Sequence, residues 1–309
     1  MFDEYNYAED ALPDDQPVIQ TSNVIRLMKF VRLLTDSENR YPKIAVVTAF
    51  AGEGKSIATR HCQDMLEHKY KAVLPASICV KIMPRATPRA VSDDISNELG
   101  ERPRRETNVY KISRESARSI RDNDTKLVIF DESNRLKDDT FEVIRYLLDK
   151  AGCPILIVGL PNVLNVIDSH EQFSSRVGMR MRFEPLSLKE VTTVVFPQLV
   201  FPRWTFDPEN EQDRLMGEEI WRRTCPSLRN VRNLLDMASK IAKAKDEPKI
   251  TIDTLREAYT WVSSHEEKRR KQKKQPPTGT HEQQSEQRHE GKGNGKKENG
   301  DKENGDEKK

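Results

Sequence analysis

The chain has 309 residues, which is enough for a sizeable core and one or two domains. Charged residues make up 33% of it, but the formal net charge is only +2, so only local clusters can indicate nucleic-acid binding. Its four cysteines form no CxxC pair, its acidic N-terminus lacks the apolar core of a secretory signal, and no run reaches the roughly 18 apolar residues of a membrane helix. We therefore expect a soluble, cytoplasmic protein with reduced thiols and no membrane partner.

The first two-thirds of the chain carry the pattern of an α/β domain. Residues 1–17 are acidic and predict a flexible leader, and from 18 to 187 short apolar strands alternate with amphipathic helices. The Val- and Ile-rich runs suit strands buried on both faces of a parallel sheet. Five strands are expected, at Lys43–Thr48, Ser77–Ile82, Lys126–Phe130, Pro154–Val158 and Arg180–Phe183.

The rest of the chain carries no strand signal. Residues 188–263 predict a small all-α lid domain, with the prolines at helix ends or between helices. Its helices are expected at Lys189–Val200, Glu209–Thr224, Ser227–Lys245 and Thr251–Val262. No apolar residue follows Val262, so we expect 264–309 to be a disordered, charged tail without helix.

Residues 49–56 read Ala-Phe-Ala-Gly-Glu-Gly-Lys-Ser and match the phosphate-loop pattern GxxxxGK[ST], with Ala49 in place of the first glycine. Gly52 and Gly54 allow the backbone to turn its N–H groups toward phosphate oxygens. Lys55 is expected to reach the β- and γ-phosphates, and Ser56 to ligate Mg²⁺. The full set of loop residues expected to contact ATP is Ala49, Gly52, Glu53, Gly54, Lys55, Ser56 and Ile57. The alternative is a glycine-rich turn that binds nothing.

Leu127–Phe130 is an apolar run that ends in two carboxylates, Asp131 and Glu132. Asp131 is expected to contact the nucleotide and hold Mg²⁺, and Glu132 to polarise the water that attacks the γ-phosphate. The pair favours an ATPase over a small-molecule kinase, which needs no such glutamate. The alternative is an acidic helix cap after a buried strand.

Two arginines are candidates for charge stabilisation during hydrolysis. Arg176 precedes the fifth predicted strand, from where it can project to the γ-phosphate of a neighbouring subunit. Arg229 lies early in a predicted lid helix and can contact the nucleotide of its own chain. For both, the alternative is a solvated surface arginine.

Several of these segments together resemble the AAA+ transposition ATPases, the family that includes the phage Mu B protein, TnsC and TniB. The resemblance covers about residues 18–262. It rests on the phosphate loop, LVIFDESNRL at 127–136, FSSR at 173–176, the compact lid and the entry segment VIQTSNV at 18–24.

The resemblance implies a P-loop AAA+ three-layer sandwich with a five-stranded parallel sheet and a helical lid. It also implies a DNA-binding regulator of transposition that forms rings or helical filaments on duplex DNA with ATP and Mg²⁺. Such a protein recruits or activates a transposase, with or without a target-selector protein, and hydrolysis disassembles it.

The resemblance further assigns roles to single residues. Lys55, Glu132 and Arg176 match the catalytic positions, with Arg176 as the finger supplied in trans. Arg229 matches the lid sensor. One position departs from the family, because Leu160 follows Gly159 where a polar sensor is usual. Asn162 is the nearest polar substitute and is expected to contact the nucleotide, and we expect hydrolysis to be slow.

By the same resemblance, DNA contacts are expected between the second and third strands. That region supplies Arg85, Arg89, Arg102, Arg104, Arg105, Thr107 and Lys111. Arginines facing a phosphate backbone give salt-sensitive binding without sequence preference. The alternative is a solvated basic loop. The basic run 268–274 can likewise hold DNA, dock a transposase or only keep the tail soluble.

The main hypothesis is therefore an ATPase whose output is its own assembly on DNA. The alternatives are an AAA+ loader or remodelling ATPase of the replication or clamp-loader type, a nucleotide-gated scaffold with negligible hydrolysis, and a signalling ATPase with the tail as receptor.

Overall fold

The structure, a computed structural model, describes residues 18–36, 44–71, 74–102, 108–200, 207, 209–224 and 227–274. The expected leader at 1–17 and the part of the expected tail beyond Lys274 lie outside these residues. Contacts within the chain separate a unit Met1–Val262 from a second unit, Ser263–Lys309. All the features described below belong to the first unit, except the C-terminal part of the last helix.

Five parallel strands form one sheet in the order β2-β3-β4-β1-β5. This order places β4 between β1, which leads into the phosphate loop, and β3, which ends in the acidic pair. All the carboxyl ends lie at one edge, where ligands bind in open α/β sheets. The strands are β1 Ile44–Thr48, β2 Ser77–Lys81, β3 Leu127–Asp131, β4 Ile155–Gly159 and β5 Val177–Arg182.

The first four strands lie within one residue of their predicted positions where the structure describes them. The fifth was predicted at Arg180–Phe183 but begins three residues earlier, at Val177. β5 pairs only with β1 and so lies at the edge of the sheet. Its first four residues alternate between partly buried and exposed, and Met181 is its one buried residue, so its apolar signal is weak before Met181.

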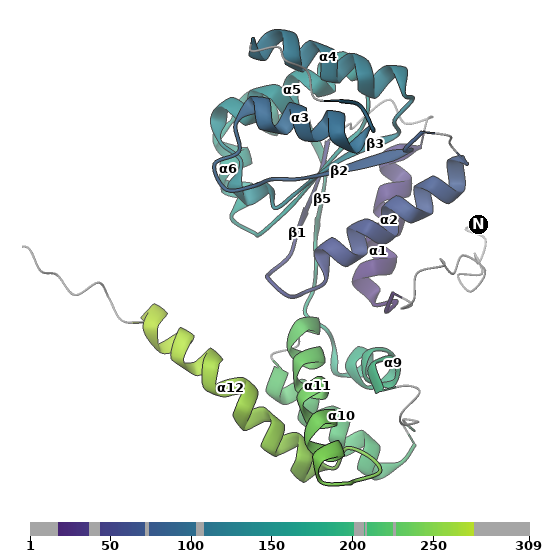
Figure 1. Cartoon of the computed structure of the whole chain (residues 1–309), viewed down its shortest axis with the longest axis vertical. Helices are drawn as coiled ribbons and strands as arrows, with labels where there is room; N and C mark the ends of the chain where they lie inside the picture. The colour runs from purple at the N-terminus through teal and green to yellow at the C-terminus, as the bar shows by residue number, and fades with distance from the viewer. Residues whose placement is uncertain are drawn as a thin grey trace, which may run out of the picture. The chain divides into compact units, whose positions relative to one another are not determined.

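Helices cover both faces of the sheet, giving the three-layer sandwich that the family resemblance implied (Figure 1). One face packs against α1 Ser22–Thr35 and α2 Lys55–Tyr70. The other face packs against the remaining helices of the α/β domain. These are α3 Pro88–Glu98, α4 Val109–Asp122, α5 Asp138–Ala151, α6 Val163–Ser169 and α7 Glu171–Ser174, with a 3₁₀ turn, η1, at Ser133–Arg135.

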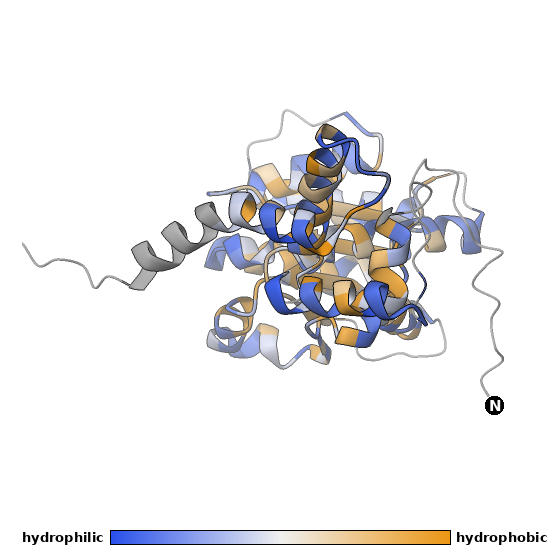
Figure 2. Cartoon of the chain, turned by 90° about the horizontal axis from the view of Figure 1, so that it is seen from below, coloured by the Kyte–Doolittle hydropathy of each residue, from blue (hydrophilic) through white to orange (hydrophobic). Residues whose placement is uncertain are grey.

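The lid helices bury a core of their own, which includes Val195, Phe196, Ile220 and Leu255. Hydrophobic residues concentrate on the strands and on the inward faces of the helices, and hydrophilic residues on the outward faces (Figure 2). The lid elements are α8 Leu188–Glu190, a π-helical turn η2 Val191–Val195, α9 Phe196–Val200, α10 Glu211–Thr224, α11 Leu228–Ala244 and α12 Ile252–Lys274.

The prediction for the first lid helix was wrong in one respect. Pro197 lies inside a continuous helical stretch, Leu188–Val200, and not at a helix end. The π-helical turn directly before α9 shifts the hydrogen-bond register, and Phe196 N–H bonds to Val191. Such a turn accommodates a proline, which has no N–H to donate.

The prediction that no helix follows Val262 was also wrong, because α12 continues to Lys274. Residues 263–274 are mostly Glu, Lys, Arg and Gln. These residues favour helix without any burial, whereas the prediction relied on apolar content alone. In the part of the chain that the structure describes, no helix combines the length and the apolar character needed to cross a bilayer.

Candidate active site

The phosphate loop joins β1 to α2. Gly52 and Gly54 have φ values of 90° and 87°, which glycine adopts without strain. Ala49 is buried, lies among the residues of ordinary φ, and its N–H donates to the carbonyl of Gly159 at 3.1 Å. The position therefore needs no glycine, which explains why alanine is accepted there.

Lys55 closes the loop on itself. Its side chain is buried, and Nζ donates to the carbonyls of Ala49 at 3.1 Å and Phe50 at 3.2 Å. Burial lowers the pKa of Lys55 and outweighs the carboxylates of Glu132, Asp131 and Glu53, which raise it. An anion bound in the loop would add to the carboxylates and favour the charged form of the lysine.

The two residues expected to hold Mg²⁺ lie in contact. Ser56 Oγ donates to Asp131 Oδ2 at 2.7 Å, and the N–H of Glu132 donates to Asp131 Oδ1 at 2.7 Å. Asp131 is only 4% exposed, so these hydrogen bonds fix its carboxylate. Within the described ranges, no group of three or more His, Cys, Asp or Glu could form a metal cage. One carboxylate, one hydroxyl, water and phosphates are the usual ligands of Mg²⁺ beside a nucleotide.

Glu132 is the first residue after β3 and has a left-handed backbone, with φ 56° and ψ 32°. A non-glycine residue rarely adopts this conformation, and such strain concentrates at functional sites. Its carboxylate faces Arg135, with Oε2 3.7 Å from Nη2, while Arg135 Nη1 donates to the carbonyl of Ile82 at 3.2 Å. Arg135 was not among the predicted site residues, although it lies within the quoted segment 127–136.

The polar side chain that meets the end of β4 is Asn134, from η1. Its Oδ1 accepts a hydrogen bond from the N–H of Leu160 at 3.2 Å. Asn162, the predicted substitute for a sensor, is exposed and its side chain makes no capping hydrogen bond at the start of α6. Its contact with the nucleotide therefore stays a prediction.

The N-terminus of α11 meets the phosphate loop directly. The N–H of Arg229 donates to the carbonyl of Gly52 at 3.0 Å, and Ser227 Oγ donates to the same carbonyl at 3.3 Å. A Cβ on Gly52 would lie 2.7 Å from Ser227 Oγ, so only glycine permits this approach. The exposed guanidinium of Arg229 is near enough to contribute to the lowered pKa of Lys55.

The entry segment ties α1 to the start of the lid. The amide of Asn23 exchanges two hydrogen bonds with the backbone of Glu184, at 2.7 and 3.0 Å. The N–H groups of Ser22 and Ser187 donate to the carboxylate of Glu190 at 2.8 and 3.2 Å. Burial raises the pKa of Glu190, but these hydrogen bonds outweigh it and keep the pKa below its ordinary value.

Arg176 lies apart from the phosphate loop of its own chain. Its guanidinium bonds to Asp149 on α5, at 3.4 and 3.5 Å, and to the carbonyl of Gln172. None of these contacts involves a nucleotide-site residue, which agrees with a role toward a neighbouring subunit. That role stays a prediction.

The predicted DNA-binding residues divide into two groups. Arg104, Arg105 and Thr107 lie outside the described residues. The others are on the surface: Arg85 is in a turn after β2, Arg89 pairs with Asp93 at 3.4 Å, Arg102 is exposed, and Lys111 is in the first turn of α4.

The exposed face of α4 carries more cations than the prediction included. Lys111, Arg114, Arg118 and Arg121 are all exposed and follow one another at three- and four-residue steps, so they lie along one side of the helix. Asp122 pairs with Arg118 at 3.2 Å and with Arg121 at 3.8 Å. We call these four cations the α4 ridge. Their helical spacing is visible in the sequence and could have identified them.

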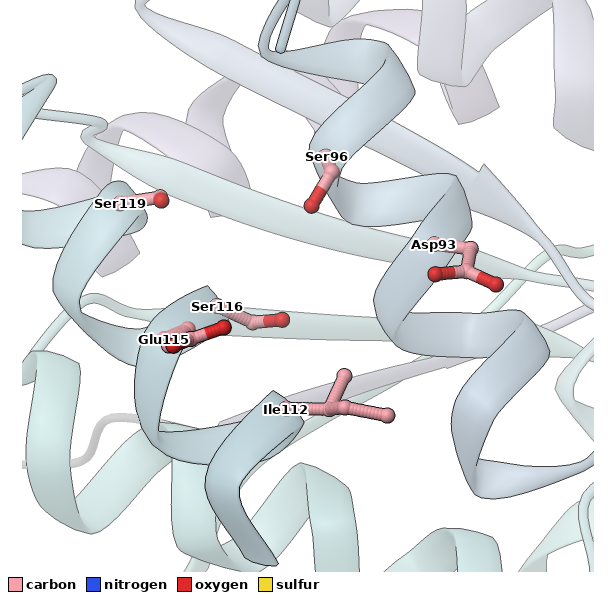
Figure 3. Close-up of a pocket in the computed structure, with 6 residues that line it drawn as sticks. All are labelled: Asp93, Ser96, Ile112, Glu115, Ser116 and Ser119. Atoms are coloured by element: carbon pink, nitrogen blue, oxygen red, sulfur yellow. The ribbon is translucent and has the colours of Figure 1, made fainter. Parts of the chain in front are cut away.

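A small recess lies between α3 and α4 (Figure 3). It is lined by Asp93 and Ser96 from α3 and by Ile112, Glu115, Ser116 and Ser119 from α4. It has room for about one water molecule. None of its residues belongs to the nucleotide site, and we assign it no role.

A family model described as "AAA domain" matches residues 38–167. The match includes the phosphate loop and the acidic pair, and it ends before Arg176 and the lid. No curated protein matches the chain in sequence.

Solved structures of similar fold include ORC and Cdc6 proteins. The Aeropyrum pernix ORC2 protein, in ADPNP–ADP complexes, has a TM-score of 0.61 at 16% identity, covering 80% of this chain and 68% of that chain. The A. pernix ORC1 protein in complex with DNA has a TM-score of 0.58 at 17% identity, covering 82% and 68%. Cdc6p from Pyrobaculum aerophilum has a TM-score of 0.56 at 16% identity, covering 81% and 69%. At these identities the likeness shows the fold alone, which is the P-loop AAA+ fold.

Proposed function

We propose that the chain is a Mg²⁺-dependent ATPase whose nucleotide state controls its assembly on double-stranded DNA. The observation that carries the proposal is the hydrogen bond between Ser56 of the phosphate loop and Asp131 of β3, with Glu132 directly after it. It supports the proposal because Mg²⁺-dependent hydrolysis needs a phosphate-binding loop, metal ligands and a carboxylate base close together, and these residues meet at one edge of the sheet.

Each residue of the site then has a defined task in hydrolysis. Lys55 neutralises β- and γ-phosphate oxygens, and Ser56 and Asp131 hold the metal. When bound there, Mg²⁺ would offset charge on the transferring phosphoryl group. The carboxylate of Glu132 orients the attacking water and accepts its proton. Arg176 of a neighbouring subunit stabilises the charge that develops in the transition state, so hydrolysis depends on assembly.

DNA binding is assigned to the surface that contains the α4 ridge. From Lys111 to Arg121 the ridge extends for roughly 15 Å along the helix. A row of exposed cations suits contacts with the phosphate backbone. The fold neighbour A. pernix ORC1, solved in complex with DNA, supports a DNA-bound role for this fold.

Two biological outputs fit this chemistry. The first is regulation of transposition, in which the ATP-bound oligomer on DNA recruits or activates a transposase and hydrolysis disassembles it. The entry segment, the FSSR sequence and the compact lid support this output. The second is a replication-type AAA+ initiator or loader, which the ORC and Cdc6 fold neighbours favour. A transposase gene beside the gene of this protein favours the first output, and a replicative helicase gene the second.

Electron microscopy of the full chain with duplex DNA and a non-hydrolysable ATP analogue tests the proposal. We expect rings or filaments on DNA that require the analogue. The double variant Arg114→Glu, Arg118→Glu should bind DNA much more weakly. The slope of log affinity against log salt concentration should also become shallower, by about one unit for each phosphate contact removed.

The matched control is Lys240→Glu, which removes an exposed cation from α11 of the lid. It should leave DNA binding near the wild-type level. A nucleotide-loaded monomer that ignores DNA overturns the assembly proposal, and unchanged binding in the double variant removes the α4 ridge from it.

A further inference from the structure

The end of β4 is placed to couple the two halves of the nucleotide site. β4 lies between β1 and β3 in the sheet. The carbonyl of Gly159, its last residue, accepts a hydrogen bond from Ala49 at the start of the phosphate loop, at 3.1 Å. The side chain of Leu160, the next residue, cannot form hydrogen bonds. A side-chain hydrogen bond between the end of β4 and the Glu132 side of the site must therefore come from a different residue.

Asn134 makes that link. It lies two residues after Glu132, in η1, and its Oδ1 accepts the N–H of Leu160 at 3.2 Å. Glu132 is therefore connected to the phosphate loop in three steps. The backbone joins Glu132 to Asn134, and Asn134 accepts a hydrogen bond from Leu160 after β4. The last residue of β4, Gly159, accepts a hydrogen bond from Ala49 of the loop.

Gly159 allows this close approach. A Cβ at Gly159 would lie 3.1 Å from the backbone nitrogen of Asn134 and 3.4 Å from its Oδ1. The first distance is shorter than ordinary van der Waals contact, and the neighbour is backbone, which cannot swing aside as a side-chain tip can. A larger residue at 159 would therefore push the η1 turn away from β4.

The other polar side chains of η1 are engaged elsewhere. Ser133 Oγ donates to the carbonyl of Phe130 at 2.7 Å, and Arg135 Nη1 donates to the carbonyl of Ile82 at 3.2 Å. These bonds run to β3 and to the end of β2. Among the η1 side chains, Asn134 is thus the one that reaches β4.

We propose that Asn134 is a positioning residue for ATP hydrolysis, which fixes the Glu132 carboxylate relative to the phosphate loop through the backbone of Leu160. The inference rests on the proposed ATPase function of the site. It explains how the site aligns its catalytic glutamate without a polar side chain at position 160. Asn134 acts through Glu132 and carries no chemistry of its own.

Asn134→Ala tests the inference in the full chain. We expect kcat for ATP hydrolysis to fall about 10- to 100-fold, since a small displacement of a catalytic group costs that order of rate. KM and the affinity for a non-hydrolysable ATP analogue should change less than about two-fold, because the phosphate-binding groups stay in place. Asn165→Ala, an exposed asparagine on the neighbouring α6, is the matched control.

A double-mutant cycle with Glu132→Gln separates positioning from a general structural effect. If Asn134 acts through Glu132, Asn134→Ala lowers kcat no further in the Glu132→Gln background. Additive losses overturn the inference. Gly159→Ala disturbs the same contact from the other side and should reproduce the kcat loss, also without adding to Asn134→Ala. It provides the test if Asn134→Ala does not fold.

The outcomes also separate this inference from the proposed function. A wild-type chain that binds ATP and assembles on duplex DNA but does not hydrolyse ATP overturns both. An active wild type with an unaffected Asn134→Ala variant overturns the inference alone. If Asn162→Ala loses hydrolysis and Asn134→Ala does not, the polar residue that the site needs is Asn162, as predicted from the sequence, and the inference is overturned.

Discussion

The protonation of Lys55 links nucleotide binding to pH. Burial lowers the pKa of Lys55 below its ordinary 10.5, and the carboxylates of Glu132, Asp131 and Glu53 act in the opposite direction. A bound triphosphate adds negative charge beside the amino group and so raises the pKa. At any pH where Lys55 of the free site is neutral, nucleotide binding must therefore be accompanied by uptake of a proton by its amino group.

We expect the affinity for an ATP analogue to fall as pH rises, beginning below 10.5, because the neutral amine does not pair with phosphate. Titration calorimetry in buffers of different ionisation enthalpy measures the proton uptake. Lys55→Arg, which stays charged, is the matched variant and should show no uptake in that range. Affinity that is constant up to pH 10.5 contradicts the prediction.

The lowered pKa of Lys55 also affects the stability of the chain without nucleotide, and here the trend with pH is opposite to that of nucleotide affinity. Between the lowered pKa of folded Lys55 and the unfolded value near 10.5, the unfolded chain binds more protons than the folded chain. The contribution of Lys55 to the free energy of unfolding therefore rises with pH in that window and is smallest below it.

At the scale of single residues, contiguous motifs were predictable and long-range contacts were not. The phosphate loop and the pair Asp131–Glu132 each occupy one short segment, so their pattern is visible in the sequence. The contacts of Asn134 with Leu160 and of Arg135 with Ile82 join residues 26 and 53 positions apart. They depend on the strand order, which no local pattern encodes.

Among the elements, α11 and the phosphate loop depend on each other through one glycine. Gly52→Ala would place a Cβ 2.7 Å from Ser227 Oγ and 3.0 Å from Arg229 Cβ, at a φ of 90°. We expect weaker ATP binding and a detached first turn of α11. Hydrogen exchange at the amide of Arg229, which bonds to Gly52, measures the detachment.

Gly100→Ala is the control for backbone strain alone. Gly100 has a φ of 74°, but a Cβ there meets nothing within 4 Å. We expect about 1–2 kcal/mol of lost stability from the left-handed backbone, with nucleotide affinity unchanged. Equal behaviour of the two variants would mean that strain, and not the lid contact, explains the effect of Gly52→Ala.

Element boundaries were predictable where burial is strong. β1 to β4 are buried runs and lie within one residue of their predicted ends. β5 has one buried residue, and residues 263–274 of α12 contain no apolar residue, so the bounds of both elements were predicted wrongly. The π-helical turn before Pro197 depends on packing within the lid core, where Val191, Val195 and Phe196 are fully buried.

For the whole molecule, the proposed function predicts that a neighbouring subunit completes the site. Because Arg176 makes no contact with its own phosphate loop, Arg176→Ala should leave ATP binding intact and abolish the hydrolysis that depends on assembly. Mixing Arg176→Ala with Glu132→Gln should restore part of the activity, because each variant supplies what its neighbour lacks. ATPase titrations on duplex DNA measure this complementation.

Arg180→Ala is the matched control on the same surface, since Arg180 pairs with Asp168 at 2.8 Å and has no assigned catalytic role. It should neither lose activity nor restore it in mixtures with Glu132→Gln. Hydrolysis by Arg176→Ala at the wild-type rate in the assembled state, or a mixture no more active than its parts, would exclude a finger supplied in trans.

The docking of α11 on the carbonyl of Gly52 also has a thermodynamic consequence. Suppose that bound nucleotide changes this contact and thereby changes the affinity of the lid for a partner. By reciprocity, the partner must then change the affinity for nucleotide by the same factor. A partner that engages the lid can thus act as an exchange factor without touching the nucleotide. Nucleotide binding and partner binding would then be coupled through one backbone carbonyl.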